Sequence, residues 1–291
     1  MVNGGGRELS EAASAMASGV RVIESSVNRG VAGGYNLGRS VATGELMVLM
    51  HDDIELEPGW LQSWIDAADR HPEAGVIGCK VLYPDGTLRG AGSILWSDAY
   101  TSPPWTGERP PPDAFDTPRL VDYSASCSLL IRSQTWDDCG GLDEDLYPAY
   151  YIDVDIAMSA RNLGWSVLYW PQACVRHDWD HPAKLRWQGF VAARNRDRFM
   201  ARWSDHLPFQ HPNDGDVEGA ITRAAQWRPA GRSSEGADGG PPRLAPRSVV
   251  SHSDEYYREL ELELRADYIR FLESALDSSE QRLSELRSSQ A

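Results

Sequence analysis

Strand-like and helix-like segments alternate along the first two thirds of the chain, and this alternation restricts the fold more than any other feature. From residue 1 to about 205, short β-rich or apolar runs are separated by segments with helical periodicity. This order is typical of an α/β domain in which helices flank a largely parallel sheet. We therefore predict an α/β domain over residues 1–205 with a mostly parallel sheet flanked by helices.

The clearest predicted elements are one strand and one helix. Glu45–Met50 (ELMVLM) is a continuous apolar run, as found in strands buried on both faces. Trp60–Arg70 follows Pro58-Gly59 and places its apolar residues on one helical stripe. The remaining strands are expected at 20–24, 76–82, 126–132, 167–170 and 173–176, and the remaining helices at 34–43 and 153–163. The proline-rich segment 100–118 is expected as a surface loop over the face that bears the site.

The C-terminal third has a different composition. Residues 206–252 are dense in Gly, Pro, Ser, Asp and Arg, most of all over 211–250, which predicts a disordered linker. Residues 253–288 place apolar side chains near heptad spacing, although Asp267 and Arg282 interrupt a strict repeat. We expect an amphipathic helix there that either packs on the domain or pairs with a second copy to form a homodimer.

The charge and the apolar runs restrict the partners and the compartment. A formal net charge of −15 disfavours nucleic acid and a broad grip on anionic membranes, because both need clustered Lys and Arg. No run reaches the ~20 apolar residues of a transmembrane helix, and the N-terminus lacks the pattern of a signal peptide. The four cysteines form no Cys-x-x-Cys pair and are expected as free thiols. We predict a cytoplasmic protein that is at most peripheral at a membrane.

Two carboxylates follow directly after the apolar run at 45–50. His51-Asp52-Asp53 would lie beyond the carboxyl end of a buried strand, where open parallel sheets bind ligands. Asp52 and Asp53 at that place suit a hard divalent cation that is held together with substrate phosphates. The alternative is an acidic turn or helix start, because further acids and a proline follow at 55–58.

Asp153 and Asp155 open a predicted helix, and His177 ends a predicted strand. Aspartates at a helix start often only cap amides and complement the macrodipole, but a carboxylate there can also act as a general base. A lone histidine is more often structural or solvated, yet a histidine at a strand end is also a good metal ligand. His181 is a second candidate.

A glycine-rich turn at 28–36 (NRGVAGGYN) joins a predicted strand to a helix. Such turns let the backbone approach a phosphate or a nucleoside closely. The spacing differs from the Gly-x-Gly-x-x-Gly dinucleotide fingerprint, so the turn by itself indicates little.

The order of these motifs is more specific than any one of them. Asn-x-Gly-x-x-Gly-Gly-x-Asn precedes the apolar run, His-Asp-Asp and Pro-Gly-Trp-Leu. Ser-Cys-Ser-Leu-Leu-Ile-Arg, Gly-Gly-Leu-Asp-Glu, Tyr-Tyr-Ile-Asp-Val-Asp and the final His177 then follow. Over residues 1–205 this order resembles the family 2 glycosyltransferases with the Rossmann-like GT-A fold, and most of all their rhamnosyltransferase-like branch.

The resemblance implies a metal-dependent, inverting glycosyltransferase of polysaccharide biosynthesis. Such an enzyme moves a sugar from a nucleoside-diphosphate donor to a hydroxyl of a glycan, lipid-linked or small-molecule acceptor. By this likeness Asp53 and His177 would bind Mg²⁺ or Mn²⁺, and Asp153 would be the catalytic base. Asp155 would support the helix start, and His51 stands where the family often has Asp or Asn. The implied donor-binding residues are Asn28, Gly30, Gly33, Asn36, Asp52 and Asp53.

The family's usual first apolar strand has no counterpart here, because Met1–Gly5 matches the end of the family's second strand. A start further upstream, a strand supplied by a partner chain, and a degenerate family member would each explain this. The last explanation leads to an alternative function, a catalytically silent binding or assembly protein on the same fold. The two functions differ in whether the chain binds a nucleotide sugar.

Overall fold

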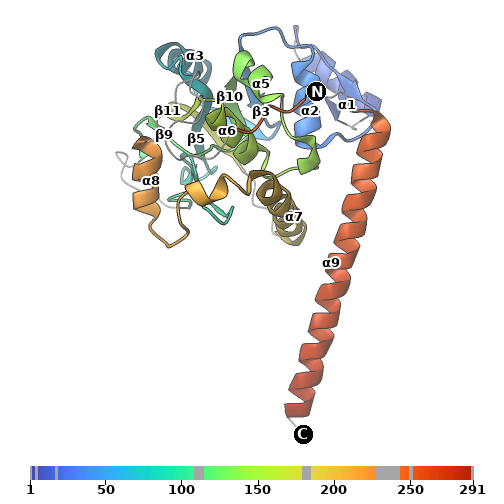
Figure 1. Cartoon of the computed structure of the whole chain (residues 1–291). Helices are drawn as coiled ribbons and strands as arrows, with labels where there is room; N and C mark the ends of the chain where they lie inside the picture. The colour runs from blue at the N-terminus through green and yellow to red at the C-terminus, as the bar shows by residue number, and fades with distance from the viewer. Residues whose placement is uncertain are drawn as a thin grey trace.

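The computed structural model describes residues 2–3, 6–16, 19–107, 115–178, 185–226, 243–248 and 252–289 (Figure 1). The strands are β1 (Val2–Asn3), β2 (Glu24–Ser25), β3 (Leu46–Met50), β4 (Ile54–Leu56), β5 (Ala74–Leu82), β6 (Leu88–Gly90), β7 (Ile94–Leu95), β8 (Thr101–Ser102), β9 (Arg119–Leu120), β10 (Ser128–Arg132) and β11 (Ser166–His177). The helices are α1 (Gly6–Met16), α2 (Gly30–Arg39), α3 (Trp60–Arg70), α5 (Ser133–Cys139), α6 (Ile152–Asn162), α7 (Leu185–Trp203), α8 (Val217–Gln226) and α9 (Asp254–Ser289).

A central sheet in the order β3-β10-β5-β11-β4, with β6 beside β5 and β9 beside β11, forms the middle layer. In the described part of the chain, β5 and β11 are its one parallel pair, and every other pairing in this sheet is antiparallel. The prediction of a mostly parallel sheet is therefore wrong. An apolar run indicates a strand in the core but carries no information about its direction. The run at 45–50 forms β3 at the edge of the sheet, where only Met47 and Leu49 are buried. Here β10 inserts between β3 and β5 and runs against both.

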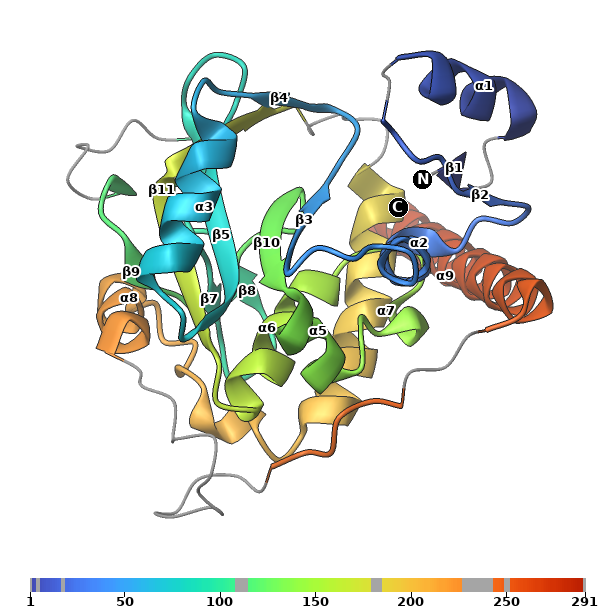
Figure 2. The same ribbon diagram turned by 90° about the horizontal axis from the view of Figure 1, so that it is seen from above.

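Helices cover both faces of this sheet (Figure 2). Successive residues of β5 alternate between the two sides, so Val76 packs into the cluster with α6, and Ile77 packs into the cluster with Trp64 of α3. Both layers are expected from the helical stripes in the sequence, and the sheet with its flanking helices makes a mixed α/β domain.

The two predicted strands at 167–170 and 173–176 are one continuous strand, β11. Its register against β5 shifts between Trp170 and Cys174, on either side of Pro171. Proline cannot donate to the ladder, so it is accommodated at such an irregularity. The strand continues beyond this shift and ends at His177, a residue of the candidate site.

Part of the segment 206–252, predicted to be a disordered linker, forms regular structure. Residues 217–226 form α8, whose Ala220 and Ala224 pack with Ile94 and Trp96. Val217, Ala220, Ile221 and Ala224 do repeat with helical spacing, but two of them are alanines, so the apolar signal is weak. Residues 243–248 also lie on the domain, while residues 227–242 fall outside the described residues.

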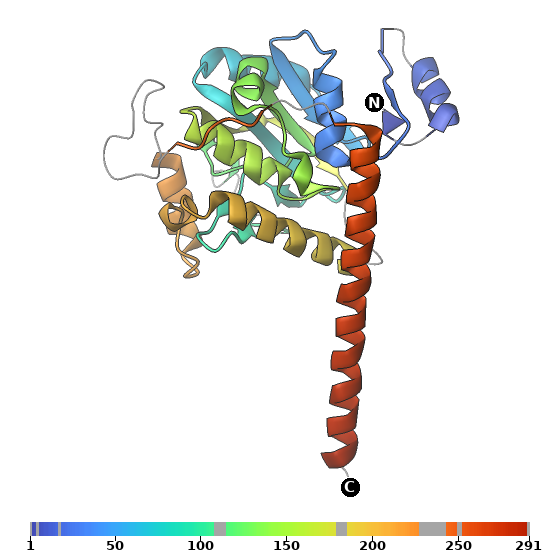
Figure 3. The same ribbon diagram turned by 45° about the vertical axis from the view of Figure 1, so that its right-hand side comes forward.

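The helix expected at 253–288 is present as α9. Tyr257, Leu260 and Leu264 on its first turns are buried against Tyr147 and Val191. Tyr268 and Phe271 further along α9 contact Phe190 of α7. The C-terminal part of α9 beyond them extends away from the domain (Figures 1 and 3). None of the described helices is both long enough and apolar enough to cross a membrane.

Candidate active site

Asp53 and His177 meet because β4 pairs antiparallel with the end of β11. His177 lies opposite Ile54 in this pairing, which places Asp53 directly beside it. The Nε2 of His177 is 3.0 Å from Oδ1 of Asp53. His177 is 1% exposed, whereas the side chain of Asp53 is half exposed, so the pair opens to one side. The structure thus brings together the two residues predicted as metal ligands.

His51 joins this pair as a third potential ligand, a role that the sequence did not suggest. Its backbone N–H donates to the carbonyl of Cys127 at the start of β10, which fixes the turn after β3. Its Nδ1 is 3.9 Å from Oδ1 of Asp53, and its ring lies 5.5 Å from the ring of His177. One ligand atom from each of the three residues lies within 4.8 Å of the others. Asp52 is exposed and lies outside this cluster.

The protonation of the two imidazoles suits metal binding. Burial lowers the pKa of His51, and the neighbouring His177 lowers it further, against the opposing effect of Asp53. Burial also lowers the pKa of His177, with an additional contribution from Arg89. A neutral imidazole is the form that ligates a metal. Two nitrogens and a carboxylate fit Mn²⁺ better than Mg²⁺, which prefers oxygen ligands, and they leave coordination positions for substrate oxygens.

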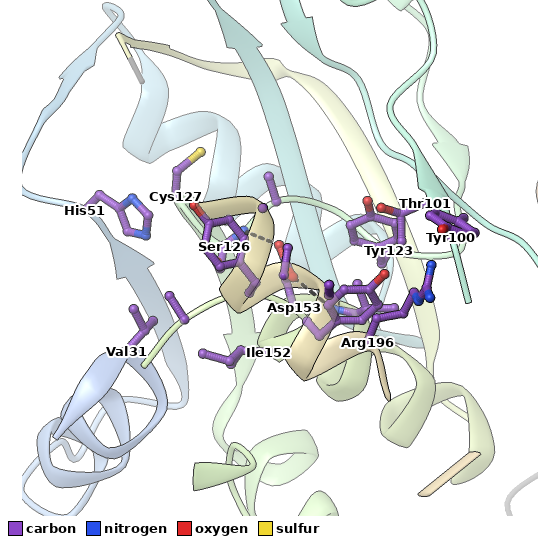
Figure 4. Close-up of a pocket in the computed structure, with 18 of the residues that line it drawn as sticks. Val31, His51, Tyr100, Thr101, Tyr123, Ser126, Cys127, Ile152, Asp153 and Arg196 are labelled. Atoms are coloured by element: carbon purple, nitrogen blue, oxygen red, sulfur yellow. Dashed lines mark hydrogen bonds between the residues drawn. The ribbon is translucent and has the colours of Figure 1, made fainter. Parts of the chain in front are cut away.

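A pocket of about 530 Å³ connects this cluster to Asp153. Figure 4 shows His51 at one end of the pocket and Asp153 nearer its middle. His177 also lines the pocket, and its ring lies 5.5 Å from that of His51. Oδ2 of Asp153 accepts from the backbone N–H of Ser126 at 3.2 Å, and Oδ1 accepts from that of Val154 at 3.0 Å. Burial raises the pKa of Asp153, although these two hydrogen bonds favour its charged form. A carboxylate of raised basicity that faces a pocket is suited to remove a proton.

The backbone before Asp153 has an unusual conformation. Tyr150 and Tyr151, both of which line the pocket, have positive φ values of 71° and 65°. Ala99 has a φ of 61°, and its carbonyl accepts from the hydroxyl of Tyr151 at 2.8 Å. Non-glycine residues with positive φ are uncommon and concentrate at functional sites. Tyr150 and Tyr151 directly precede α6, whose first turn carries Asp153.

The four residues of the glycine-rich turn that were predicted to bind the donor do not line this pocket. Asn28 accepts from the backbone N–H of Gly30, and the side chain of Asn36 donates to the carbonyl of Leu142 and to Glu144. Gly33 lies against the ring of Tyr257 on α9. Gly30, Gly33 and Asn36 lie within α2, which begins at Gly30, so most of the predicted turn is helical. These residues contact neighbouring protein segments, and their part in donor binding stays a prediction. Val31 of the same turn does line the pocket.

Two arginines of the pocket were missed by sequence reasoning. Arg89 follows the turn at Pro84-Asp85-Gly86, and Arg196 lies on α7. Both line the pocket with Tyr100, which is 53% exposed. Arginine is common on surfaces, and no spacing in the sequence connects these positions with His51 or Asp153. Only the tertiary structure brings them together.

Comparisons with known proteins identify similar sequences over about half of the chain. The sequence profile described as "Glycosyl transferase family 2" matches residues 2–137. An N-acetylglucosaminyl-diphospho-decaprenol L-rhamnosyltransferase of Mycobacterium tuberculosis is 26% identical over 165 residues, which are 53% of this chain and 53% of the relative. The O-antigen biosynthesis protein RfbC of Myxococcus xanthus is 27% identical over 151 residues, which are 49% of this chain and 12% of the relative. This chain therefore spans about half or less of these two relatives.

A partial structural likeness also exists. A crystal structure of GalNAc-T7 with UDP, GalNAc and Mn²⁺ aligns with a TM-score of 0.48 and 14% identity, over 64% of this chain and 38% of the other. The predicted family is confirmed by the sequence matches. Residues 2–137 of the chain match the glycosyl transferase family 2 domain.

Proposed function

We propose that the chain is an inverting, metal-dependent glycosyltransferase that moves a sugar from a nucleoside-diphosphate donor to an acceptor hydroxyl. The observation that carries this proposal is one pocket lined by His51, His177 and Asp153, with Asp53 3.0 Å from His177. A metal-ligand set and a basic carboxylate within one pocket are what this reaction needs. The GT-A arrangement implied by the family resemblance supports the same assignment.

His51, Asp53 and His177 would hold Mn²⁺, and Asp53 would keep the cluster open toward the diphosphate of the donor. When bound, the ion offsets the negative charge that grows on the departing diphosphate. Asp153 takes the proton from the acceptor hydroxyl as that oxygen bonds to the anomeric carbon. The bond from that carbon to the diphosphate breaks on the opposite face, which inverts the anomeric configuration.

The test is the binding and hydrolysis of a panel of UDP-, dTDP- and GDP-sugars with Mn²⁺ and with a chelator. We expect one nucleotide to bind in the presence of Mn²⁺ and to lose most of its affinity when EDTA is added. Asp53→Ala should abolish the metal-dependent part of the binding, because it removes the charged ligand of the cluster. Glu55→Ala is the matched control, since Glu55 is an exposed carboxylate two residues away on β4.

The results separate the proposal from a catalytically silent protein. Donor hydrolysis that needs both Mn²⁺ and Asp153 supports the enzyme. Binding without any hydrolysis or transfer would indicate the silent alternative. If no nucleotide sugar binds, or if Asp53→Ala and Glu55→Ala behave alike, the proposed site is wrong.

A further inference from the structure

The pocket has two ends, and only one of them is used by the proposed donor. Figure 4 shows His51 at one end, Arg196 and Tyr100 at the other, and Asp153 between them. If the diphosphate lies at the His51 end, the acceptor must reach Asp153 from the Tyr100 end. This step rests on the proposed function, whereas the chemistry of the Tyr100 end follows from its own residues.

Arg196 differs from its neighbours on α7 in what it contacts. Arg194 and Arg198 make ion pairs with Glu263 of α9 at 3.2 and 2.7 Å, and Arg202 lies 3.4 Å from Asp155. The nearest carboxylate to Arg196 among the described residues is Asp197 at 3.8 Å, whose side chain is 74% exposed. An exposed pair at that separation contributes little. Arg196 is therefore the α7 arginine that lines the pocket without a close carboxylate.

The guanidinium of Arg196 is oriented by an aromatic ring. Its central carbon lies 4.1 Å from the centroid of the Tyr100 ring. Stacking uses the face of the guanidinium and leaves the N–H groups at its edge for an acceptor in the same plane. The Nε of Arg196 is buried, and no described residue accepts a hydrogen bond from it. A side-chain hydrogen bond with Tyr100 also raises the pKa of Arg196, and 23% of the side chain is exposed. An arginine that is held in this way and keeps its charge is suited to bind an anion.

The overall charge of the protein is strongly negative, so a cation in the pocket matters for the binding of an anion. With 43 acidic and 28 basic residues, the chain repels anions in general. An anionic group can approach Asp153 only where a local cation compensates for this repulsion. Arg89 also lines the pocket and, beside the larger effects of burial, acts to lower the pKa values of both His177 and Asp153. Arg196, in contrast, lies at the Tyr100 end.

We propose that Tyr100 and Arg196 form an acceptor subsite that binds an anionic group, a phosphate or a carboxylate, of the acceptor molecule. Holding this group would orient the attacking hydroxyl toward Asp153. Binding energy from a part of the substrate that does not react can lower the barrier in this way. The subsite thus selects acceptors that carry a negative charge next to the sugar that is extended.

The test measures the binding of three probes that share an octyl chain: octyl phosphate, octyl glucuronide and octyl glucoside. Calorimetry is done in EDTA without nucleotide, so the metal cluster and the donor play no part. We expect the wild-type protein to bind one or both anionic probes at least about tenfold more tightly than octyl glucoside. Binding of octyl phosphate alone identifies a phosphate, and binding of octyl glucuronide alone identifies a carboxylate.

Arg196→Gln should remove this preference, and Arg196→Lys should retain part of it, because it keeps the charge but loses the planar fork. Arg198→Gln is the matched control on the same helix, since Arg198 pairs with Glu263 instead of lining the pocket. Thermal unfolding of each variant shows that the fold is retained. Equal binding of all three probes, or unchanged anion binding in Arg196→Gln, would overturn the proposal.

The outcomes also separate this inference from the proposed function. If nucleotide sugars bind with Mn²⁺ but Arg196→Gln does not change the binding of the anionic probes, only the proposed acceptor subsite is wrong. If binding of the anionic probes depends on Arg196 but no nucleotide sugar binds, the anion site is supported and the glycosyltransferase assignment is wrong.

Discussion

Asp153 combines a functional advantage with a structural cost. Its carboxylate faces the pocket, and burial raises its pKa above the ordinary value of 3.8. A raised pKa makes Asp153 a better base, but it also means that its charged form is unfavourable in the folded protein. Two backbone N–H groups stabilise the charge only in part. The residue that we propose for proton removal should therefore destabilise the fold at neutral pH.

Asp153→Asn tests both consequences. Transfer or donor hydrolysis should fall by about 10²- to 10⁴-fold, since the base is lost. The raised folded pKa stabilises the protein below the unfolded pKa of 3.8, and this stabilisation is lost as the pH rises through the folded pKa. The melting temperature of Asp153→Asn relative to wild type should therefore increase between pH 4 and pH 8. A difference that stays constant with pH would show that the pKa of Asp153 is not raised.

At the scale of elements, α9 packs against α2 and the segment before α6. Tyr257 contacts Gly33, its hydroxyl hydrogen-bonds Glu144, and the hydroxyl of Tyr147 donates to Glu261 at 2.5 Å. Packing on the domain is thus one of the two expected roles of this helix. Leu262, Ile269 and Leu276 remain exposed and recur every seven residues, so pairing with a second copy stays a prediction.

Two glycines of α2 provide a matched test of the contact with α9. A Cβ at Gly33 would lie 2.8 Å from the ring of Tyr257, whereas a Cβ at Gly38 would meet nothing within 4 Å. Gly33→Ala should lower the free energy of unfolding by about 1–3 kcal/mol through overpacking. Gly38→Ala should raise it by about 0.5–1 kcal/mol, because alanine favours the helix. Urea unfolding measures both, and equal effects would exclude close packing at Gly33.

At the scale of the whole molecule, residues 243–248 pack on the domain against residues about 100 positions earlier in the sequence, such as Cys139 and Asp155. Arg247 is held by Asp155 and by Asp143 at 3.5 Å, and its Nη1 donates to the carbonyl of Gly141 at 3.2 Å. Asp155 is 1% exposed and also accepts from the indole of Trp203 at 2.8 Å. The residue before α6 makes no side-chain capping hydrogen bond, and the expected role of Asp155 at the helix start stays a prediction. Asp155 also connects α6 and α7 with the C-terminal part of the chain.

Arg247→Ala should destabilise the protein by about 3–5 kcal/mol, because it leaves the carboxylate of Asp155 buried beside fewer donors. Arg223→Ala removes an ion pair with Asp216 on the surface and should leave the stability nearly unchanged, because solvent screens this pair. Chemical denaturation of both variants gives the comparison. If the two losses are similar, residues 243–248 do not contribute to the stability of the domain.

Local patterns in the sequence predicted several of the elements, the family and three of the residues that the structure places at the candidate site, Asp53, Asp153 and His177. The apolar run before His51, the stripe of Trp60–Arg70 and the acids at 153 and 155 depend on neighbours along the chain. Helical and strand periodicity therefore identify them. The order of the motifs was sufficient to indicate a glycosyltransferase.

The tertiary structure alone decided the strand directions and the composition of the site. The direction in which a buried strand runs depends on long-range pairing, and an apolar run looks the same in either direction. The antiparallel pairing of β4 with β11 is what places Asp53 beside His177 and completes the cluster with His51. The same holds for Arg196, which becomes a pocket residue only because α7 packs beside Tyr100. Contacts between residues so far apart in sequence have no local pattern from which they could be predicted.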